Sequence, residues 1–330
     1  LDIKTNILPN ADALFLIAID PYGHELWRWT FPVNKLNQQT EQLSPLSSRP
    51  AYTETENELT VKANKRTFIF SKKDGQLKGV SVDNRKISFA NGPRFIGARR
   101  ADRSLDQFYN HDDEKAKEKD RTYSEFPDAA VFTKLDVKED GGNLVVTANY
   151  KLGNLDKTQW TINPSGELAL DYTYNFSGVV DLMGIRFDYP EDQVISKRWL
   201  GAGPYRVWQN RIHGTQYDVW ENDYNDPIPG ETFTYPEFKG YFGDVSWMNI
   251  QTKEGTISLT NETPDAYIGV YQPRDGRDRL LYTLPESGIS VLNVIPPVRN
   301  KVNSTDLCGP SSQPKWVNGP QTGRVIFRFM

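Results

Sequence analysis

Two short segments of this 330-residue chain combine aromatic side chains with amide, guanidinium and carboxylate groups. Sugar recognition needs a flat aromatic face for the apolar side of the ring and polar groups for its hydroxyls. The segments 208–211 and 220–224 supply both kinds of group, so the sequence predicts carbohydrate contacts there. The candidates are Trp208, Asn210, Arg211, Trp220, Glu221, Asp223 and Tyr224. The competing interpretation, a tryptophan buried between sheets, is favoured for the nearby Trp199.

Metal and thiol chemistry have weaker support in the sequence. The run 222–226 carries oxygen ligands of the kind that Ca²⁺ or Mg²⁺ binds, but Asx-turns explain such clusters more often. The three histidines, His24, His111 and His213, lack metal-ligand spacing. Cys308 is the single cysteine, so an internal disulfide and a thiolate metal cage are excluded. We expect no cofactor.

The elements that must position these residues are predicted to be β-strands. Apolar and polar residues alternate in segments such as 59–63, and turn residues at 73–76 separate two such runs. The chain also has 24 glycines and 21 prolines, which supply the turns that a meander of strands needs. The sequence therefore predicts an all-β fold, a sandwich or a barrel.

Three regions are expected along the chain. Residues 1–35 contain a predicted strand pair, 13–19 with 26–31, which is marginal by itself and which we interpret as the tail of a preceding β domain. Residues 36–50 are rich in Gln, Ser and Pro and indicate a linker, and 51–330 form the main domain. The almost wholly charged run 112–121 is expected to be a solvated loop or short exposed helix.

Charge and hydropathy exclude two classes of partner. The 39 basic and 43 acidic residues give a formal charge of −4, and no basic block is present, which argues against nucleic-acid binding. The longest apolar run, 13–19, is far shorter than the roughly 20 residues of a membrane helix. No basic region precedes that run as in a signal peptide. The compartment stays open between a bacterial cytoplasm and periplasm.

The segments 186–190, 197–205, 220–224 and 234–237 form the most distinctive part of the sequence. Their order resembles the C-terminal small-chain domain of family 2 β-galactosidases, in which a Trp-x-Gly-x-Gly-Pro-x-Glu segment is followed by Tyr, Pro and Glu in a loop. The segment 64–77 is similar to the opening of that domain. The segments 11–16 and 27–29 look like the last strands of the immunoglobulin-like domain that precedes it.

The resemblance implies a galactose-mutarotase-like super-β-sandwich of two large antiparallel sheets, after a partial immunoglobulin-like strand pair. It also implies a retaining β-galactosidase whose catalytic glutamates lie in a separate barrel, and no part of this sequence reads as that barrel. We therefore expect a non-catalytic portion, inactive alone, which contacts galactosides and the other domains of the parent enzyme. In well-known members a late tryptophan reaches the active site, and Trp316 is the candidate here.

The sequence departs from the family in the segment 94–103, where the pattern Arg-Ala-Pro-x-Asp-Asn-Asp is only loosely kept. Two alternatives to the non-catalytic domain stay open. One is a stand-alone binding module for galactose-containing glycans. The other is an aldose mutarotase, which would use a histidine such as His213 as its acid and a carboxylate as its base.

Overall fold

The two-residue alternation of the sequence becomes strands with one buried and one more exposed face. The computed structural model describes residues 11–33, 48–100, 123–224, 238–270, 284–298 and 313–330. In β5 (Arg66–Ser71), for example, the inward Phe68 and Phe70 are fully buried, and Ile69 between them is partly exposed. The elements of the described ranges are strands, apart from short turns such as η2 (Glu191–Gln193).

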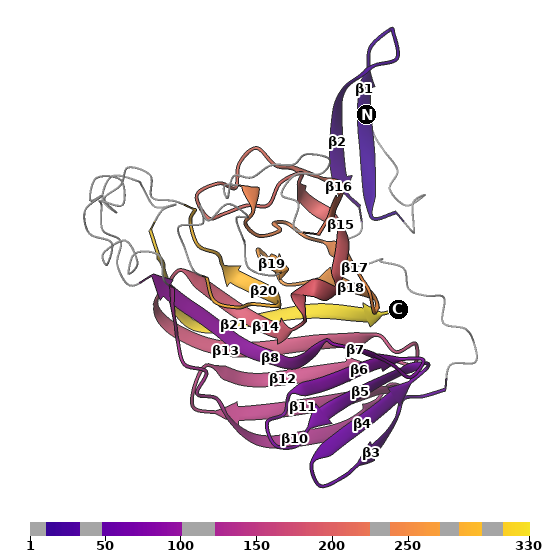
Figure 1. Ribbon diagram of the computed structural model, residues 1–330, viewed down its shortest axis with the longest axis vertical. Helices are drawn as coiled ribbons and strands as arrows, with labels where there is room; N and C mark the ends of the chain where they lie inside the picture. Colours follow the sequence, from indigo (N-terminus) through magenta and orange to yellow (C-terminus); the bar gives the residue numbers. More distant parts are fainter. Residues whose placement is uncertain (1–10, 34–47, 101–122, 225–237, 271–283, 299–312) are drawn as a thin grey trace.

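Two large antiparallel sheets make up the main domain (Figure 1). The nine-stranded sheet has the spatial order β10 (Val131–Asp140), β11 (Asn143–Lys151), β12 (Leu155–Ile162), β13 (Leu168–Val180), β21 (Lys315–Phe329), β18 (Gly255–Asn261), β17 (Trp247–Thr252), β15 (Val194–Gly203), β16 (Gln216–Asp223). The ten-stranded sheet has the order β19 (Tyr267–Val270), β20 (Ile289–Val294), β14 (Leu182–Asp188), β8 (Ala90–Arg100), β6 (Leu77–Val82), β5, β4 (Glu58–Ala63), β3 (Ala51–Glu54), with β7 (Arg85–Ile87) beside β6 and β9 (Tyr123–Glu125) beside β8. The predicted fold class, two large antiparallel sheets, is confirmed.

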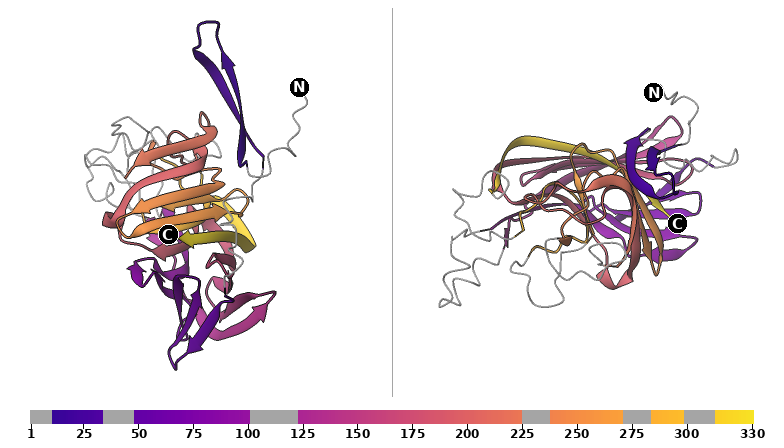
Figure 2. Two further views of the ribbon diagram at one scale, coloured as in Figure 1. Left: turned by 90° about the vertical axis from the view of Figure 1, so that its right-hand side faces the viewer. Right: turned by 90° about the horizontal axis from the view of Figure 1, so that it is seen from above.

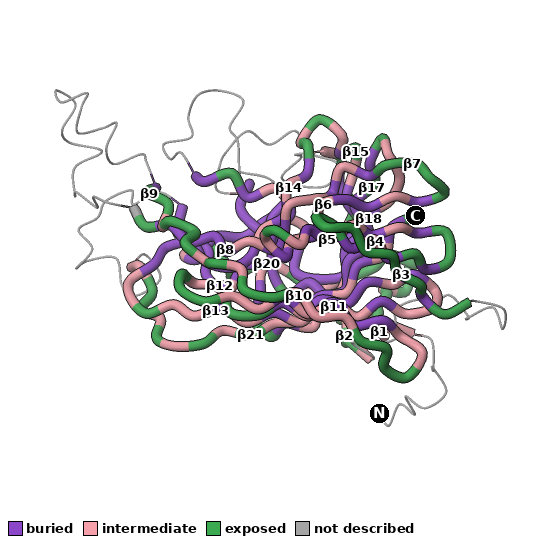
Figure 3. The backbone as a smooth tube through the Cα atoms, turned by 90° about the horizontal axis from the view of Figure 1, so that it is seen from below, coloured by how far each residue is buried: buried purple, intermediate pink, exposed green. Residues whose placement is uncertain are grey.

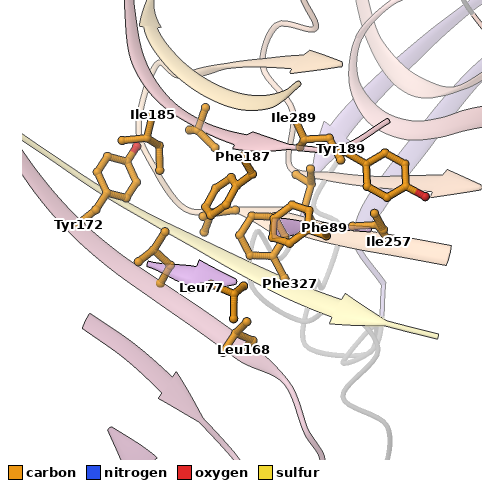
Figure 4. Packing of buried hydrophobic residues seen from close by; sticks show 14 of the residues in the cluster. Leu77, Phe89, Leu168, Tyr172, Ile185, Phe187, Tyr189, Ile257, Ile289 and Phe327 are labelled. Carbon is orange, nitrogen blue, oxygen red and sulfur yellow. The ribbon is translucent and has the colours of Figure 1, made fainter. Parts of the chain in front are cut away.

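The core lies between the two sheets and is aromatic at its centre. Phe187 comes from β14 of the ten-stranded sheet, and its ring stacks on Phe89 with centroids 4.7 Å apart. Phe327 of β21 and Trp160 of β12 meet Phe187 from the nine-stranded sheet at 5.4 Å and 6.1 Å. Figure 4 shows Phe89, Phe187 and Phe327 converging, and the buried segments of Figure 3 gather in the same interior. Aromatic pairs at these separations add to the stabilisation from buried area.

A two-stranded hairpin extends away from the sandwich (Figures 1 and 2). Its strands, β1 (Ala13–Ile19) and β2 (Glu25–Pro32), confirm the predicted strand pair. Leu16 pairs with Trp29 and lies on an apolar face where both side chains are 44% exposed. On the opposite face an Arg28 Nη1 lies 4.0 Å from Asp218 of β16. The face with Arg28, which also carries Phe15 and Ile17, is therefore the one that contacts the sandwich.

Several expectations about organisation lie largely outside the described residues. The charged run 112–121 and most of the expected linker 36–50 lie outside the described residues. The immunoglobulin-like origin of the hairpin and the three domain boundaries stay predictions. Within the described ranges, no helix is long and apolar enough to cross a membrane.

We predict that Phe187→Ala destabilises the fold by about 3–5 kcal/mol, because it opens a cavity in a core that joins both sheets. Urea unfolding followed by tryptophan fluorescence measures this change. Tyr22→Ala is the control, because Tyr22 is 86% exposed and its loss should stay within about 0.5 kcal/mol. Equal losses in the two variants would contradict the assignment of Phe187 to the core.

We also predict a loss of stability in alkaline solution. Burial raises the pKa of Tyr172 from 10.0 to about 12. The unfolded chain therefore releases this proton first, and the free energy of unfolding falls between pH 10 and pH 12 by up to about 1.4 kcal/mol per pH unit. Tyr172→Phe removes one contributor, so its unfolding free energy should fall less steeply in urea titrations over that range. Parallel slopes in both proteins would contradict the prediction.

Candidate functional site

The structure corrects the prediction that Trp208 offers its ring to a sugar. Trp208 is 1% exposed, and its ring meets Tyr241 edge to face with centroids 5.8 Å apart. A bridge between Trp208 and Arg211 closes a tight turn around it. The side chain belongs to a second buried cluster, so it is a core residue, as Trp199 is. Trp199 was expected in the core and is fully buried.

Asn210 and Arg211 hold this turn in place. The Asn210 Nδ2 donates to the Val298 carbonyl at 2.8 Å, and the Val298 amide donates to the Asn210 Oδ1 at 2.9 Å. This pair of bonds uses both the amino group and the carbonyl of the side chain against a neighbouring segment. The exposed Arg211 lies 5.0 Å above the Phe238 ring, as in a cation–π contact. Both side chains support the local structure.

The predicted residues of β16 lie at the edge of the nine-stranded sheet. Trp220 is partly buried, and its Nε1 donates to the Gln216 carbonyl at 3.2 Å. Its indole lies over Gly203, where an added Cβ would come within 2.4 Å of the ring. Glu221 and Asp223 are exposed, on the other face of the strand.

Tyr224, just past the end of β16, turns toward a different part of the molecule. Its hydroxyl donates to Glu191 of η2. Lys197, which is 2% exposed, places its Nζ 5.6 Å from the Tyr224 ring centroid. Tyr224 therefore positions a carboxylate rather than presenting an open aromatic face.

Trp316 is 72% exposed at the start of β21, opposite Val179 of β13. The turn that contains Trp208 contacts the chain just before Trp316, because the Gln209 Nε2 donates to the Gln313 carbonyl at 2.8 Å. Three strands separate β21 from β16 in the sheet. The eight predicted residues are thus divided among the 208–211 turn, the β16 edge and Trp316, and Trp316 presents the most open indole of the group.

A cleft of about 600 Å³ lies on the outer face of the ten-stranded sheet, where β8, β14 and the chain before β20 meet. This volume is in the range of small-molecule sites. The polar side chains in its lining include Asn91, Arg94, Arg186, Asp188, Glu191 and Glu286. Only Glu191 is connected to a residue predicted from the sequence, through Tyr224.

Strand alternation places the charged residues of the cleft. Arg94 of β8 is directly opposite Arg186 of β14, so both guanidinium groups lie on the same face of the sheet. Two like charges side by side repel, and neighbouring acceptors offset that repulsion. Asp188 accepts from Arg94 and, at 2.9 Å, from the Asn91 Nδ2. Arg186 donates to the backbone carbonyl of Glu286.

Two further carboxylates approach the arginines from the chain after β9 and from β9 itself. The Glu125 Oε2 lies 3.6 Å from an Arg186 nitrogen. Burial raises the pKa of Asp128, and the Ala130 amide and the nearby charges of Arg94 and Arg186 oppose that rise. The cleft therefore alternates cationic donors with anionic acceptors.

Glu254, in the turn between β17 and β18, fixes one end of the cleft. Its carboxylate accepts from the Ser88 hydroxyl at 2.6 Å, from the Ser88 amide at 2.8 Å and from the Tyr189 hydroxyl at 3.0 Å. Burial raises the pKa of Tyr189, and the carboxylate of Glu254 adds to that rise. This clamp joins the nine-stranded sheet to the two cleft residues, Ser88 and Tyr189.

The lining of the cleft offers both donors and acceptors of hydrogen bonds. Guanidinium and amide groups donate hydrogen bonds, carboxylates accept them, and none of the described lining residues is a histidine. His213 is exposed, and its backbone carbonyl accepts from the Tyr205 hydroxyl at 3.0 Å. Within the described ranges, no three His, Cys, Asp or Glu side chains gather to hold a metal ion. Asn225 and Asp226 of the considered calcium segment lie outside those ranges.

The sequence analysis did not predict the cleft. Arg186 nevertheless lies in a segment that resembles the family, and Arg94 lies in the segment that departs from it. The overlooked signal is local. Arg94 precedes the buried Phe95, and Arg186 and Asp188 flank the buried Phe187. Charged residues that alternate with core residues in central strands must share one outer face.

Comparisons with known proteins give one family match and several distant likenesses of shape. A protein-family model described as beta galactosidase small chain matches residues 62–296. No curated protein matches the chain in sequence. The crystal structure of galactose 1-epimerase from Lactobacillus acidophilus is similar with 8% identity and a TM-score of 0.42, over 86% of this chain and 99% of that chain. The GalM/aldose epimerase homologue from C. elegans has 7% identity and a TM-score of 0.42, over 85% and 99%.

We predict that Glu254→Ala lowers the free energy of unfolding by about 2 kcal/mol, because it leaves the Ser88 and Tyr189 donors without their acceptor. Tyr189→Phe removes the hydroxyl that donates to Glu254 and leaves the Ser88 bonds in place, so it should cost less, about 1 kcal/mol. Urea unfolding measures both. The exposed Glu56 provides the control Glu56→Ala. Should Glu254→Ala be as stable as that control, the clamp does not contribute to stability.

Proposed function

Because the chain belongs to the beta galactosidase small chain family, we propose that it is a non-catalytic, carbohydrate-contacting domain of a family 2 β-galactosidase. The match covers most of the described sandwich, including the strands that line the cleft. On this proposal the domain binds galactosides, and the bond-breaking groups belong to another part of the parent enzyme.

The observation that carries the proposal is the mixture of donors and acceptors in the cleft. A galactoside is neutral, and each of its hydroxyls both donates and accepts a hydrogen bond. Asp188 and Glu191 can accept from such hydroxyls, and Arg94, Arg186 and Asn91 can donate to them. Charged partners make the stronger hydrogen bonds, and they already lie on rigid strands. A strongly charged ligand would face a repulsive group of its own sign.

Hydrolysis itself is assigned elsewhere. A retaining glycosidase needs two carboxyl groups about 5–5.5 Å apart, one nucleophile and one acid. We place those glutamates in a barrel domain on other polypeptide, and we place Trp316 at the side of this domain that faces it. The open indole of Trp316 suits contact with the apolar face of a sugar.

The hairpin supplies the contact to a neighbouring domain in this proposal. A pair of strands is marginally stable alone, and the face with Leu16 and Trp29 is apolar and exposed. We infer that this face packs against further strands of an immunoglobulin-like domain of the parent enzyme.

Isothermal titration calorimetry of the chain with methyl β-galactoside and lactose tests the proposal. We predict binding that Asp188→Ala weakens about tenfold or more, because the variant removes one acceptor for sugar hydroxyls and frees Arg94. The exposed Glu139 on β10 provides the matched control Glu139→Ala, which should leave the affinity unchanged.

Three outcomes would contradict parts of the proposal. The absence of heat with any galactoside refutes binding by this chain. A loss of binding in Trp316→Ala, with Asp188→Ala unaffected, moves the sugar site from the cleft to β21. Turnover of a chromogenic galactoside by the chain alone refutes the non-catalytic role.

A further inference from the structure

A second hollowed region lies on the opposite sheet, away from the cleft. One hollow of about 430 Å³ lies against β12, β13 and β21, and another of about 480 Å³ lies beside β16, β17 and the base of the hairpin. Glu262 and Pro264 line both hollows. The two hollows therefore adjoin at residues 262–264, which we call the ridge, and we call the pair of hollows the outer groove.

The ridge exists because β18 leaves its partner strand. β18 pairs with β21 only as far as Asn261, opposite Val325. The loop that follows is then held by side chains. The Thr263 hydroxyl donates to the Arg324 carbonyl at 3.0 Å and accepts from the Arg324 amide at 2.9 Å. The Asn261 Nδ2 donates to the Val245 carbonyl at 3.3 Å and to the Thr263 carbonyl at 3.2 Å. Hydrogen bonds to Arg324 of β21 and to Val245, just before β17, therefore hold the ridge in place.

Glycine at position 323 completes the floor of the first hollow. A Cβ there would lie 2.2 Å from the Tyr172 hydroxyl, which reaches across the glycine toward Thr263. Only a residue without a side chain leaves this space to Tyr172. Tyr172 is 2% exposed and lies on the core face of the sheet, so this contact supports the first hollow from beneath.

Strand register arranges the first hollow as two rows that cross three strands. Gln159, Asp171 and Arg324 are directly opposite one another on β12, β13 and β21. The next row on the same face consists of Lys157, Thr173 and Thr322. Opposite residues of an antiparallel sheet share a face, so these six side chains form a flat polar surface.

The charges of the first hollow are mostly satisfied inside the protein. An Arg324 Nη1 lies 2.5 Å from Asp171, and its Nε lies 3.0 Å from Glu262. One guanidinium thus bridges two carboxylates and offsets one of their two negative charges. The hydroxyls of Thr173 and Thr322 are in the lining with the Gln159 amide.

The second hollow adds apolar surface and acceptors. Pro32 and Ala266 line it beside Pro264, and their CH groups suit the apolar faces of sugar rings. The Tyr217 hydroxyl and the Ser246 hydroxyl share a hydrogen bond of 2.6 Å in its wall. Asp244 and Asp265 supply carboxylates. Across both hollows the lining carries four carboxylates and two cations.

We propose that the outer groove binds a neutral, extended oligosaccharide that lies across the ridge and places sugar units in both hollows. Hydroxyl, amide and paired charged groups suit polyols, and the excess of carboxylates disfavours uronic or sulfated glycans. Lys157 and Arg324 offset two of the four carboxylates, so a formal charge of −2 remains, and the uncharged hydroxyl and amide groups beside them favour a neutral glycan over a basic peptide. This site does not depend on galactoside binding in the cleft.

Calorimetry with β-1,4-galactotetraose, galactobiose and galactose tests the proposal on the whole chain. The tetrasaccharide should bind at least about tenfold more tightly than the disaccharide, since only the longer glycan reaches both hollows. Thr322→Trp should fill the first hollow and weaken tetrasaccharide binding about tenfold or more. Thr53→Trp is the matched control, because Thr53 is an exposed strand threonine of the other sheet.

Tyr217→Phe separates the two hollows. It removes a hydroxyl from the second hollow, so it should weaken the tetrasaccharide severalfold and leave the disaccharide unchanged. Asp188→Ala in the cleft should not alter the preference for the longer glycan, which distinguishes this site from the cleft. Thermal melting of each variant establishes that it folds.

Four results would overturn the proposal. They are equal affinity for the tetrasaccharide and the disaccharide, no tetrasaccharide binding at all, an unchanged affinity in a folded Thr322→Trp variant, and equal or tighter binding of tetragalacturonate or pentalysine. Tighter pentalysine binding would identify the groove as a site for basic peptides.

Discussion

The contact of Phe187 with Phe89, Trp160 and Phe327 is the interaction on which the rest of the structure depends. It joins the two sheets through rings from four separated parts of the chain. Since side chains alternate along a strand, the inward direction of Phe187 also fixes the outward direction of Arg186 and Asp188. The same contact that closes the core therefore sets out the charged floor of the cleft.

The fold was largely predictable from the sequence because alternation is a local signal. Runs such as 59–63 and the strand pair at 13–19 identify strands directly, and the structure places both. Which strands become neighbours was not predictable from alternation. The pairing of β13 with β21 joins segments about 150 residues apart, and only the complementary shape of the packed core selects it.

The candidate site was predicted less well, for a physical reason that Trp208 illustrates. The polar neighbours of an aromatic residue suggest from the sequence that it is exposed. In the structure, however, the Asn210 amide hydrogen-bonds to Val298 and holds the turn closed over the buried indole. The cleft shows the converse. Arg94 and Arg186 look like isolated charges in separate segments, and cross-strand register brings them face to face. Neither partnership is visible before the strands are paired.

Strand β14 carries core and cleft residues on alternate positions, which couples the geometry of the cleft to the packing of the core. A shift of a few tenths of an ångström in the Phe187 backbone would pass directly to the groups on either side of it, because the peptide links between them are stiff. Small changes in core packing, caused by heating or by substitutions in the core, would then displace Arg186 and Asp188 in the cleft before the protein unfolds.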